Sequence, residues 1–236
     1  MILPLRSALI PAKMNSPKPS TRCGAYLPEF AAVLAKPWPD NATVTIVCHG
    51  HSVPVGYFRT PAVCSFDSYP HLLHRRLKEE FPYAIINVIV TARGGESSDQ
   101  GAARFEADVL SHRPDVITID YSLNDRRIGL SCAKDAWSQM IDLSFAAGVK
   151  VVVLTPTPDL KSMQPQGGDE LLSLHAAQVR QLATRFKSGL ADSYDAFDQY
   201  VSNGGSLSEL MAQHNHPNRK GHELVAAELV KCFRTA

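Results

Sequence analysis

The chain has 236 residues, 44% of them hydrophobic, so it can bury a sizeable core, and its length suits one domain better than two small ones. Twenty-four Lys and Arg residues oppose 23 Asp and Glu residues, and no run of five like charges occurs. This balance argues against a nucleic-acid or anionic-membrane partner and suits a small neutral substrate.

Cysteines and apolar stretches bear on the compartment. The five cysteines form no C-x-x-C pair, which argues against a zinc ribbon or a redox dithiol. No stretch approaches the roughly 20 apolar residues of a membrane span, and Met1–Lys13 makes a poor signal peptide because prolines and an arginine interrupt it. We expect a cytoplasmic protein without a membrane span, and the sequence leaves its oligomeric state open.

Prolines recur throughout residues 1–40. This segment is predicted to be an N-terminal extension that packs on or near the main domain, with a short helix over Glu29–Ala35. The main domain is predicted to span residues 41–236.

From residue 41, short β-branched runs alternate with segments whose apolar residues recur every three or four positions. The runs predict buried strands over Thr43–Cys48, Ala84–Val90, Asp115–Asp120 and Val149–Thr155, and a short fifth strand over Leu190–Ser193. The periodic segments predict helices over Tyr69–Glu80, Gln100–Ser111, Lys134–Ala147, Leu171–Lys187 and Gly221–Phe233. This alternation predicts an α/β domain with a mostly parallel sheet.

Ligands of an open parallel sheet collect beyond the carboxyl ends of its strands. Ser52 follows the first predicted strand in Gly50-His51-Ser52, where a tight turn would direct its hydroxyl into that crevice. A serine after a glycine is more often a plain turn or a helix cap, so this motif is weak alone.

The loops after the next two strands hold Gly95 and Asn124. Acyl transfer places negative charge on the former carbonyl oxygen, and preorganised donors aimed at that oxygen are worth about 3–4 kcal/mol each. The N–H groups of Ser52 and Gly95 and the amide of Asn124 are candidate donors for this oxyanion hole.

A neutral serine hydroxyl also needs a base. His216, in His214-Asn215-His216-Pro217-Asn218, lies just before the last predicted helix, and histidine can accept the serine proton and return it to the leaving alcohol. We therefore take His216 as the candidate base and Asn218 as the cap of that helix.

The order Gly-x-Ser, Gly, Asn-Asp, His-Pro-Asn resembles the SGNH hydrolases, also called the GDSL family, over about residues 43–233. The resemblance implies a three-layer, flavodoxin-like fold and ester hydrolysis through an acyl-enzyme. It implies that Ser52 is the nucleophile, that Gly95 and Asn124 belong to the oxyanion hole, and that His216 is the base.

The chain departs from the family pattern at three positions. His51 replaces an aspartate before the nucleophile, Ser122 replaces a glycine, and Gln213 replaces the acid three residues before the base. That acid normally orients the imidazole and stabilises the cation formed during acylation. Three arrangements remain open: Gln213 or a backbone carbonyl holds the ring, or an acid reaches it from elsewhere. The candidate acids are Glu209, Glu96 and Asp125.

The preferred hypothesis is hydrolysis of a small-molecule ester with a short acyl group, an acetyl ester on a carbohydrate being our choice, without a cofactor or a metal. One alternative is a metal site in which His49 and His51 converge with His214 and His216. The other is a non-catalytic carbohydrate- or ligand-binding module that kept the fold and lost its acid at Gln213.

Overall fold

Five parallel strands form the central sheet, which we describe from a computed structural model covering residues 26–161 and 170–234. Their order is β2-β1-β3-β4-β5. Their bounds are β1 Thr43–Gly50, β2 Ile85–Val90, β3 Val116–Asp120, β4 Lys150–Leu154 and β5 Gly189–Ala191. This is the flavodoxin-like strand order, whose switch point lies between β1 and β3. The predicted α/β fold with a mostly parallel sheet is confirmed.

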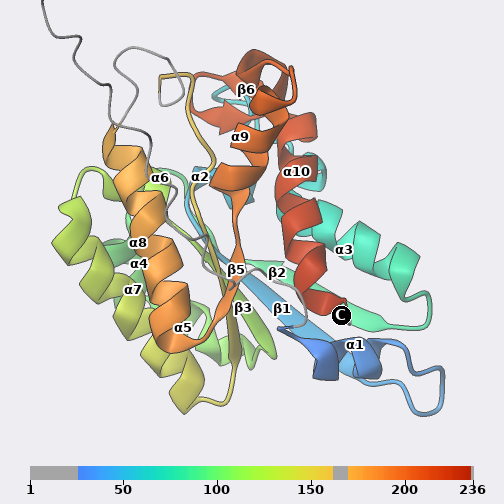
Figure 1. The fold of residues 1–236 in the computed structure, drawn as a ribbon. Coiled ribbons are helices and arrows are strands. Elements are labelled where there is room, and N and C mark those ends of the chain that lie inside the picture. Colours follow the sequence, from blue (N-terminus) through green and yellow to red (C-terminus); the bar gives the residue numbers. More distant parts are fainter. Residues whose placement is uncertain (1–25, 162–169, 235–236) are drawn as a thin grey trace, which may run out of the picture.

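Helices cover both faces of the sheet (Figure 1). One layer contains α1 Pro28–Leu34, α3 Tyr69–Glu80, α9 Ser193–Ser202 and α10 Arg219–Val230. The other contains α4 Ser98–Ala103, α5 Phe105–Asp108, α7 Gly129–Ala146 and α8 Glu170–Phe186. Two short helices, α2 Ser52–Val55 and α6 Ser122–Asp125, follow β1 and β3 directly. The carboxyl ends of the two strands beside the switch point therefore each lead into a tight helical turn.

The apolar runs of the strands separate two hydrophobic cores. Along β1, Ile46 and Cys48 belong to the core beneath α3 and α10, while Val47 between them belongs to the core beneath α4, α7 and α8. Successive side chains of a strand point to opposite faces, so a strand covered on both sides must be apolar at consecutive positions. This requirement explains why consecutive positions are apolar in β3, as at Val116 and Ile117, and in β4, as over residues 151–154.

The predicted helix over Gln100–Ser111 is wrong in its continuity. The backbone of Arg104 leaves the helical region at φ −111° and ψ 7°, and the segment divides into α4, α5 and a 3-10 turn over Leu110–His112. The Arg104 side chain turns back to bond Glu96 in the loop before α4. The apolar periodicity of the sequence continues across this break, so the pattern does not indicate it. Helix α9 was not predicted.

The part of the N-terminal extension within the described residues packs on the sheet domain. Helix α1 matches the predicted Glu29–Ala35 helix to within one residue, and Leu27 and Leu34 are fully buried. The Leu27 N–H donates to the Cys232 carbonyl at 2.9 Å, which ties the start of α1 to the end of the chain. Residues 1–25 lie outside the described residues, and the boundary at residue 40 stays a prediction.

Candidate active site

Ser52 is the first residue of α2, immediately beyond the carboxyl end of β1, and its side chain is buried. The turn into α2 requires glycine at position 50, because a Cβ there would lie 2.4 Å from the Asp120 carbonyl oxygen and 2.9 Å from Pro54 Cγ. Gly56 ends the turn in the left-handed region at φ 96°. The serine therefore occupies a tight turn pressed against the neighbouring strand β3.

His216 forms β7, His216–Pro217, which pairs antiparallel with β6, Met211–Gln213, just before α10. Its Nε2 lies 3.0 Å from Ser52 Oγ, although 164 residues separate the two side chains in the chain. Asn218 caps α10 by accepting from the Gly221 N–H at 3.2 Å, as expected. A buried hydroxyl–imidazole pair thus lies at the carboxyl edge of the sheet.

The protonation state of His216 suits a proton acceptor. Burial lowers its pKa below the usual histidine value, and positive charge on His51 or His214 would lower it further. The Phe58 carbonyl opposes this shift. Near neutral pH the ring is therefore uncharged, and its Nε2 lone pair can accept the Ser52 proton, which assigns the ring hydrogen to Nδ1.

Gln213 does not hold the imidazole of His216, and the Phe58 carbonyl favours the charged form of the ring by raising its pKa. Phe58 is close enough for its carbonyl to affect the His216 pKa, although Nδ1 makes no hydrogen bond of good geometry with any described residue. Gln213 is occupied elsewhere, because Oε1 accepts from the Thr60 N–H at 3.0 Å and Nε2 donates to Asn215 Oδ1 at 3.1 Å.

Each of the three candidate acids has its carboxylate bonded to groups other than His216. Glu209 binds Lys220 and Tyr200, Glu96 binds Arg104, and Asp125 accepts from the Ser98 N–H and the Trp137 indole. Asp125 is fully buried, and burial raises its pKa. It connects α4, α6 and α7, so its contacts position the loops after β2 and β3.

The loop that carries Gly95 is held by neighbouring side chains. Asn124 Nδ2 donates to the Glu96 carbonyl at 2.8 Å, and Arg127 donates to the Gly95 carbonyl. Gly95 itself has φ 82°. An amide nitrogen carries two hydrogens, so Asn124 can hold the loop with one N–H and present the other to a ligand.

His51 and Asp120 form a second polar pair beside Ser52. His51 Nδ1 accepts from the Val53 N–H at 3.2 Å and lies 3.5 Å from Ser52 Oγ. On the other side of the ring, Nε2 lies 3.3 Å from Asp120 Oδ1. Asp120 was not among the predicted site residues. Its signal was a charged residue that ends an otherwise apolar strand.

The histidines of the alternative metal hypothesis do not converge. His49 is fully buried between Thr91 Oγ1, the Gly101 carbonyl and the Tyr121 hydroxyl, and burial lowers its pKa to about 3. His214 is exposed, whereas His51 and His216 lie beside Ser52. Within residues 26–161 and 170–234, no three His, Cys, Asp or Glu side chains are grouped closely enough to hold a metal ion.

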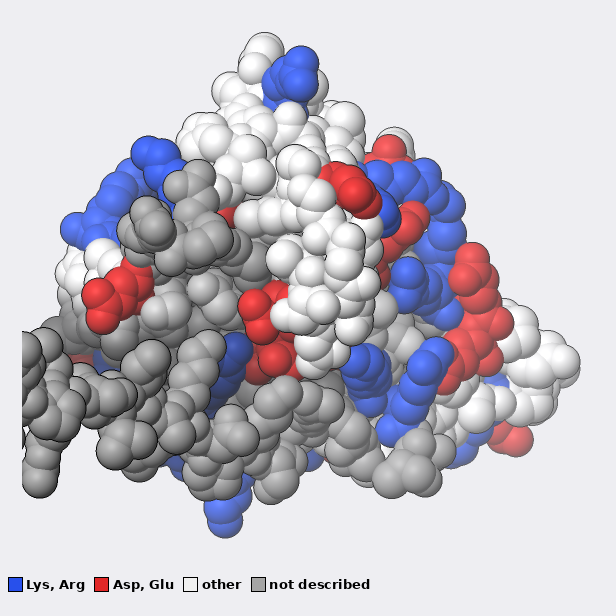
Figure 2. Space-filling model, turned by 45° about the horizontal axis from the view of Figure 1, so that its top comes forward, with Lys and Arg blue, Asp and Glu red and all other residues white. Residues whose placement is uncertain are grey.

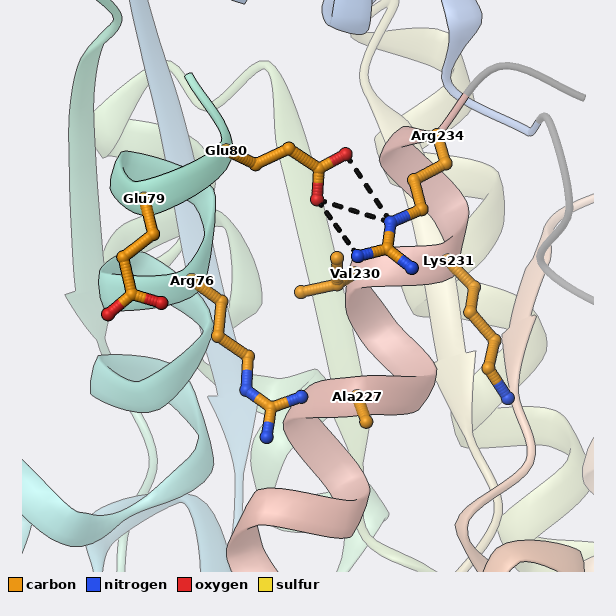
Figure 3. A pocket seen from close by; sticks show the side chains of 7 residues that line it. All are labelled: Arg76, Glu79, Glu80, Ala227, Val230, Lys231 and Arg234. Carbon is orange, nitrogen blue, oxygen red and sulfur yellow. Dashed lines mark hydrogen bonds and ion pairs between the residues drawn. The ribbon is translucent and has the colours of Figure 1, made fainter. Parts of the chain in front are cut away.

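Charges of both signs are interspersed on the face drawn in Figure 2, without an extended area of one sign among the residues it colours. A separate groove of about 520 Å³ lies between α3 and α10 (Figure 3). There Arg234, which follows α10, is bonded to Glu80, the last residue of α3, and this groove is separate from the edge of the sheet that carries Ser52.

None of the described helices is both long and apolar enough for a bilayer crossing.

The sequence profile of the GDSL-like Lipase/Acylhydrolase family matches residues 48–224 of this chain. This interval contains Ser52, Gly95, Asn124 and His216. No curated protein sequence matches the chain.

Similar solved structures share the fold at low sequence identity. The acetylxylan esterase Axe2 from Geobacillus stearothermophilus is 17% identical with a TM-score of 0.71, and the alignment covers 82% of this chain and 95% of Axe2. A two-domain esterase (CEX) active on acetylated mannans is 20% identical with a TM-score of 0.69, over 87% of this chain and 51% of that one. A putative GDSL-like lipase from Parabacteroides merdae is 15% identical with a TM-score of 0.70, over 80% and 95% of the two chains.

Proposed function

The chain belongs to the GDSL-like Lipase/Acylhydrolase family, and from that premise we propose that it is a serine esterase that removes a short acyl group, an acetyl group on a carbohydrate, through an acyl-enzyme on Ser52. The observation that carries the proposal is the buried 3.0 Å contact between Ser52 Oγ and His216 Nε2. This distance is within the range for direct proton transfer between a nucleophile and its base.

Acylation begins when Ser52 Oγ attacks the acyl carbon and its proton passes to His216 Nε2. The negative charge on the former carbonyl oxygen is stabilised by the N–H groups of Ser52 and Gly95 and by the Asn124 amide. His216 then gives its proton to the leaving alcohol oxygen. In deacylation, His216 accepts a proton from the attacking water, and Ser52 leaves as the hydroxyl.

Among the described residues, no carboxylate is bonded to the imidazole that becomes charged in each half-reaction. The Phe58 carbonyl is the group that favours the charged ring. A neutral carbonyl stabilises a cation less than a carboxylate does, so we expect a slower acylation than in an enzyme with a complete triad. The function proposed here is nonetheless catalytic, because the nucleophile and the base are in bonding contact.

The choice of a small acyl group is supported by Tyr57. Its ring centroid lies 6.0 Å from that of His216, and a Cβ on Gly94 would lie 2.9 Å from the Tyr57 ring. The tyrosine therefore forms a wall beside the catalytic pair, where a long acyl chain would meet the ring. The choice of a carbohydrate ester is supported by the shared fold with esterases described as active on acetylated xylan and mannans.

The proposal is tested by replacing Ser52. Ser52→Ala is expected to lower kcat for p-nitrophenyl acetate by at least about 10⁴-fold, because the nucleophile is lost, while the circular dichroism spectrum stays unchanged. Ser202→Ala, at an exposed serine that ends α9, is the matched control and keeps parental turnover. Retained turnover in Ser52→Ala would exclude the serine mechanism.

A fluorophosphonate probe separates this proposal from the binding-module alternative. The folded parent chain is expected to be labelled at Ser52, and the Ser52→Ala variant is not. A folded parent that is neither labelled nor able to hydrolyse p-nitrophenyl acetate would favour a module that binds carbohydrate without catalysis.

A further inference from the structure

We propose that Asp120 and His51 position the nucleophile: the Asp120 carboxylate holds His51 with its hydrogen on Nε2, and the unprotonated Nδ1 fixes the turn that carries Ser52. This inference rests on the proposed function, since it assigns a supporting role to two residues beside the proposed nucleophile. It begins from a buried histidine and a buried carboxylate in contact, which the proposed mechanism does not otherwise use.

The contacts of His51 determine which of its ring nitrogens carries the hydrogen. A backbone N–H can only donate, and the Val53 N–H points at His51 Nδ1 over 3.2 Å. Nδ1 must therefore be unprotonated, and the hydrogen of the neutral ring lies on Nε2. That hydrogen faces Asp120 Oδ1 at 3.3 Å, which is the acceptor this tautomer requires.

The contact between His51 and Asp120 is close but not ideal. Both atoms are buried, and neither reaches good hydrogen-bond geometry with any described residue. Each therefore satisfies the other's unmet electrostatic demand in the interior, where a bare carboxylate or ring N–H is costly. Asp120 ends β3, so the rigid strand beside the switch point sets the position of its carboxylate.

His51 is also connected to Ser52. By accepting the Val53 N–H, the His51 side chain serves as the N-cap of α2, whose first residue is Ser52. The cap fixes the peptide on both sides of Ser52, and hence both its hydroxyl and its N–H donor. The same Nδ1 lies 3.5 Å from Ser52 Oγ, which is too far for a strong hydrogen bond. This distance is longer than the 3.0 Å between Ser52 Oγ and His216 Nε2.

The pair faces other ionisable and polar groups from each neighbouring element. Tyr69 of α3 and Cys48 of β1 lie beside Asp120, and Thr118 of β3 lies beside both of them. Asp125 of α6 and His216 of β7 are close enough to interact electrostatically with His51. None of these groups bonds His51 Nε2 among the described residues, and the polar contact of Nε2 is the one with Asp120 Oδ1 at 3.3 Å.

His51 stands where the family pattern has an aspartate, and its contacts give this departure a structural role. The resemblance places an aspartate where this chain has His51, and either side chain can accept the N–H two residues later. Histidine, however, also reaches the end of β3. The turn of Ser52 is thereby attached to the sheet by a side-chain contact in addition to the backbone bond from His51 N to the Asp120 carbonyl at 3.2 Å.

Two variants separate the cap from the contact with Asp120. His51→Asn keeps an oxygen that can cap α2, but its shorter side chain cannot bridge to Asp120. Asp120→Asn keeps the shape but places an amide beside Nε2, which can donate as well as accept and so allows the wrong tautomer. We expect kcat for p-nitrophenyl acetate to fall about 10-fold in the first and about 10- to 100-fold in the second, with KM within about two-fold of the parent.

Asp115→Asn is the matched control for Asp120→Asn. Asp115 precedes the same strand at its opposite end, where Oδ2 accepts from the Thr45 N–H at 2.8 Å. An asparagine oxygen can keep that bond, so parental kcat is expected. If Asp120→Asn fails to fold, His51→Asn decides the question, and parental kcat in the folded His51→Asn variant would overturn the inference.

A measurement that needs no turnover keeps this inference distinct from the proposed function. In ¹⁵N-histidine-labelled protein, the nitrogen shifts of His51 are expected to show a hydrogen on Nε2 in the parent and a mixture of tautomers in Asp120→Asn. A hydrogen on Nδ1 in the parent would overturn the inference. An inactive parent with the expected tautomer would instead refute the esterase proposal alone.

Discussion

Gly50 and Asp120 approach each other so closely at the ends of β1 and β3 that a Cβ on Gly50 would lie 2.4 Å from the Asp120 carbonyl oxygen. The contact is between backbone atoms of two adjacent strands, so no side chain can move to relieve it. The same approach brings the turn of Ser52 against the end of β3, where His51 N donates to that carbonyl at 3.2 Å. Sheet packing and nucleophile placement therefore depend on the same glycine.

Gly50→Ala is accordingly expected to lower both stability and activity. Overpacking of this kind costs about 1–3 kcal/mol of unfolding free energy, and displacement of the turn should lower kcat by more than about 10-fold. Gly204→Ala is the comparison: Gly204 has open space at its Cβ position but φ 95°, where alanine is strained, so this variant should lose stability and keep parental kcat. Urea unfolding of both variants is the measurement. If Gly50→Ala loses no more stability than Gly204→Ala and keeps parental kcat, this account is contradicted.

The rate of ester hydrolysis should fall at acidic pH. Only neutral His216 can accept the Ser52 proton, and burial lowers the pKa of this histidine. The acidic midpoint of the kcat/KM profile is therefore expected below about pH 6.5, the ordinary histidine value. His214→Asn removes a positive charge that lowers the same pKa, so the midpoint should move to higher pH. A parental midpoint above 6.5 would show that another group controls the limb.

Stability should also fall in acid. Burial lowers the pKa of His49 and of His222 to about 3, whereas in the unfolded chain both titrate near the ordinary value of about 6.5. Between these values the unfolded state binds more protons, so the unfolding free energy decreases as pH falls. Each histidine contributes a slope of about 1.4 kcal/mol per pH unit within this window.

Denaturant unfolding of His222→Gln at pH 7, 6 and 5 measures one share of this slope. The variant is expected to lose less stability per pH unit than the parent, by up to about 1.4 kcal/mol. His112→Gln, at an exposed position, is the control and should match the parental slope. A parental stability that does not change from pH 7 to 5 would contradict the neutral, buried state of these histidines.

Acyl preference should depend on Tyr57. Removing the ring beside His216 in Tyr57→Ala opens the wall next to the catalytic pair. The ratio of kcat/KM for p-nitrophenyl octanoate to that for the acetate is expected to rise about 10-fold or more, since a few additional methylenes can then be buried. Phe66→Ala, at an exposed aromatic side chain, should leave the ratio unchanged. An unchanged ratio in Tyr57→Ala would mean that another surface limits the acyl group.

Particular elements show how far the sequence is informative. The short β-branched and apolar runs predicted the first four strands to within two residues at each end, because burial in a sheet favours such residues whatever their neighbours are. The break in the helix at Arg104 was not predicted, because the apolar periodicity continues across it and the salt bridge of Arg104 to Glu96 cannot be read from that pattern. Helix α9 was missed where the pattern was short, between β5 and the β6–β7 hairpin.

The α/β fold class and the candidate site residues both followed from the sequence, since strand periodicity and the order of motifs along the chain are local properties. What lies around those residues is visible only in the folded chain. Gln213 bonds the Thr60 N–H rather than His216, and the Asp120 carboxylate reaches His51. The contact between Asp120 and His51 depends on β1 and β3 lying side by side although their paired residues are 70 positions apart, and Gln213 and Thr60 are 153 residues apart in the chain. Spacing along the chain carries no information about such distances.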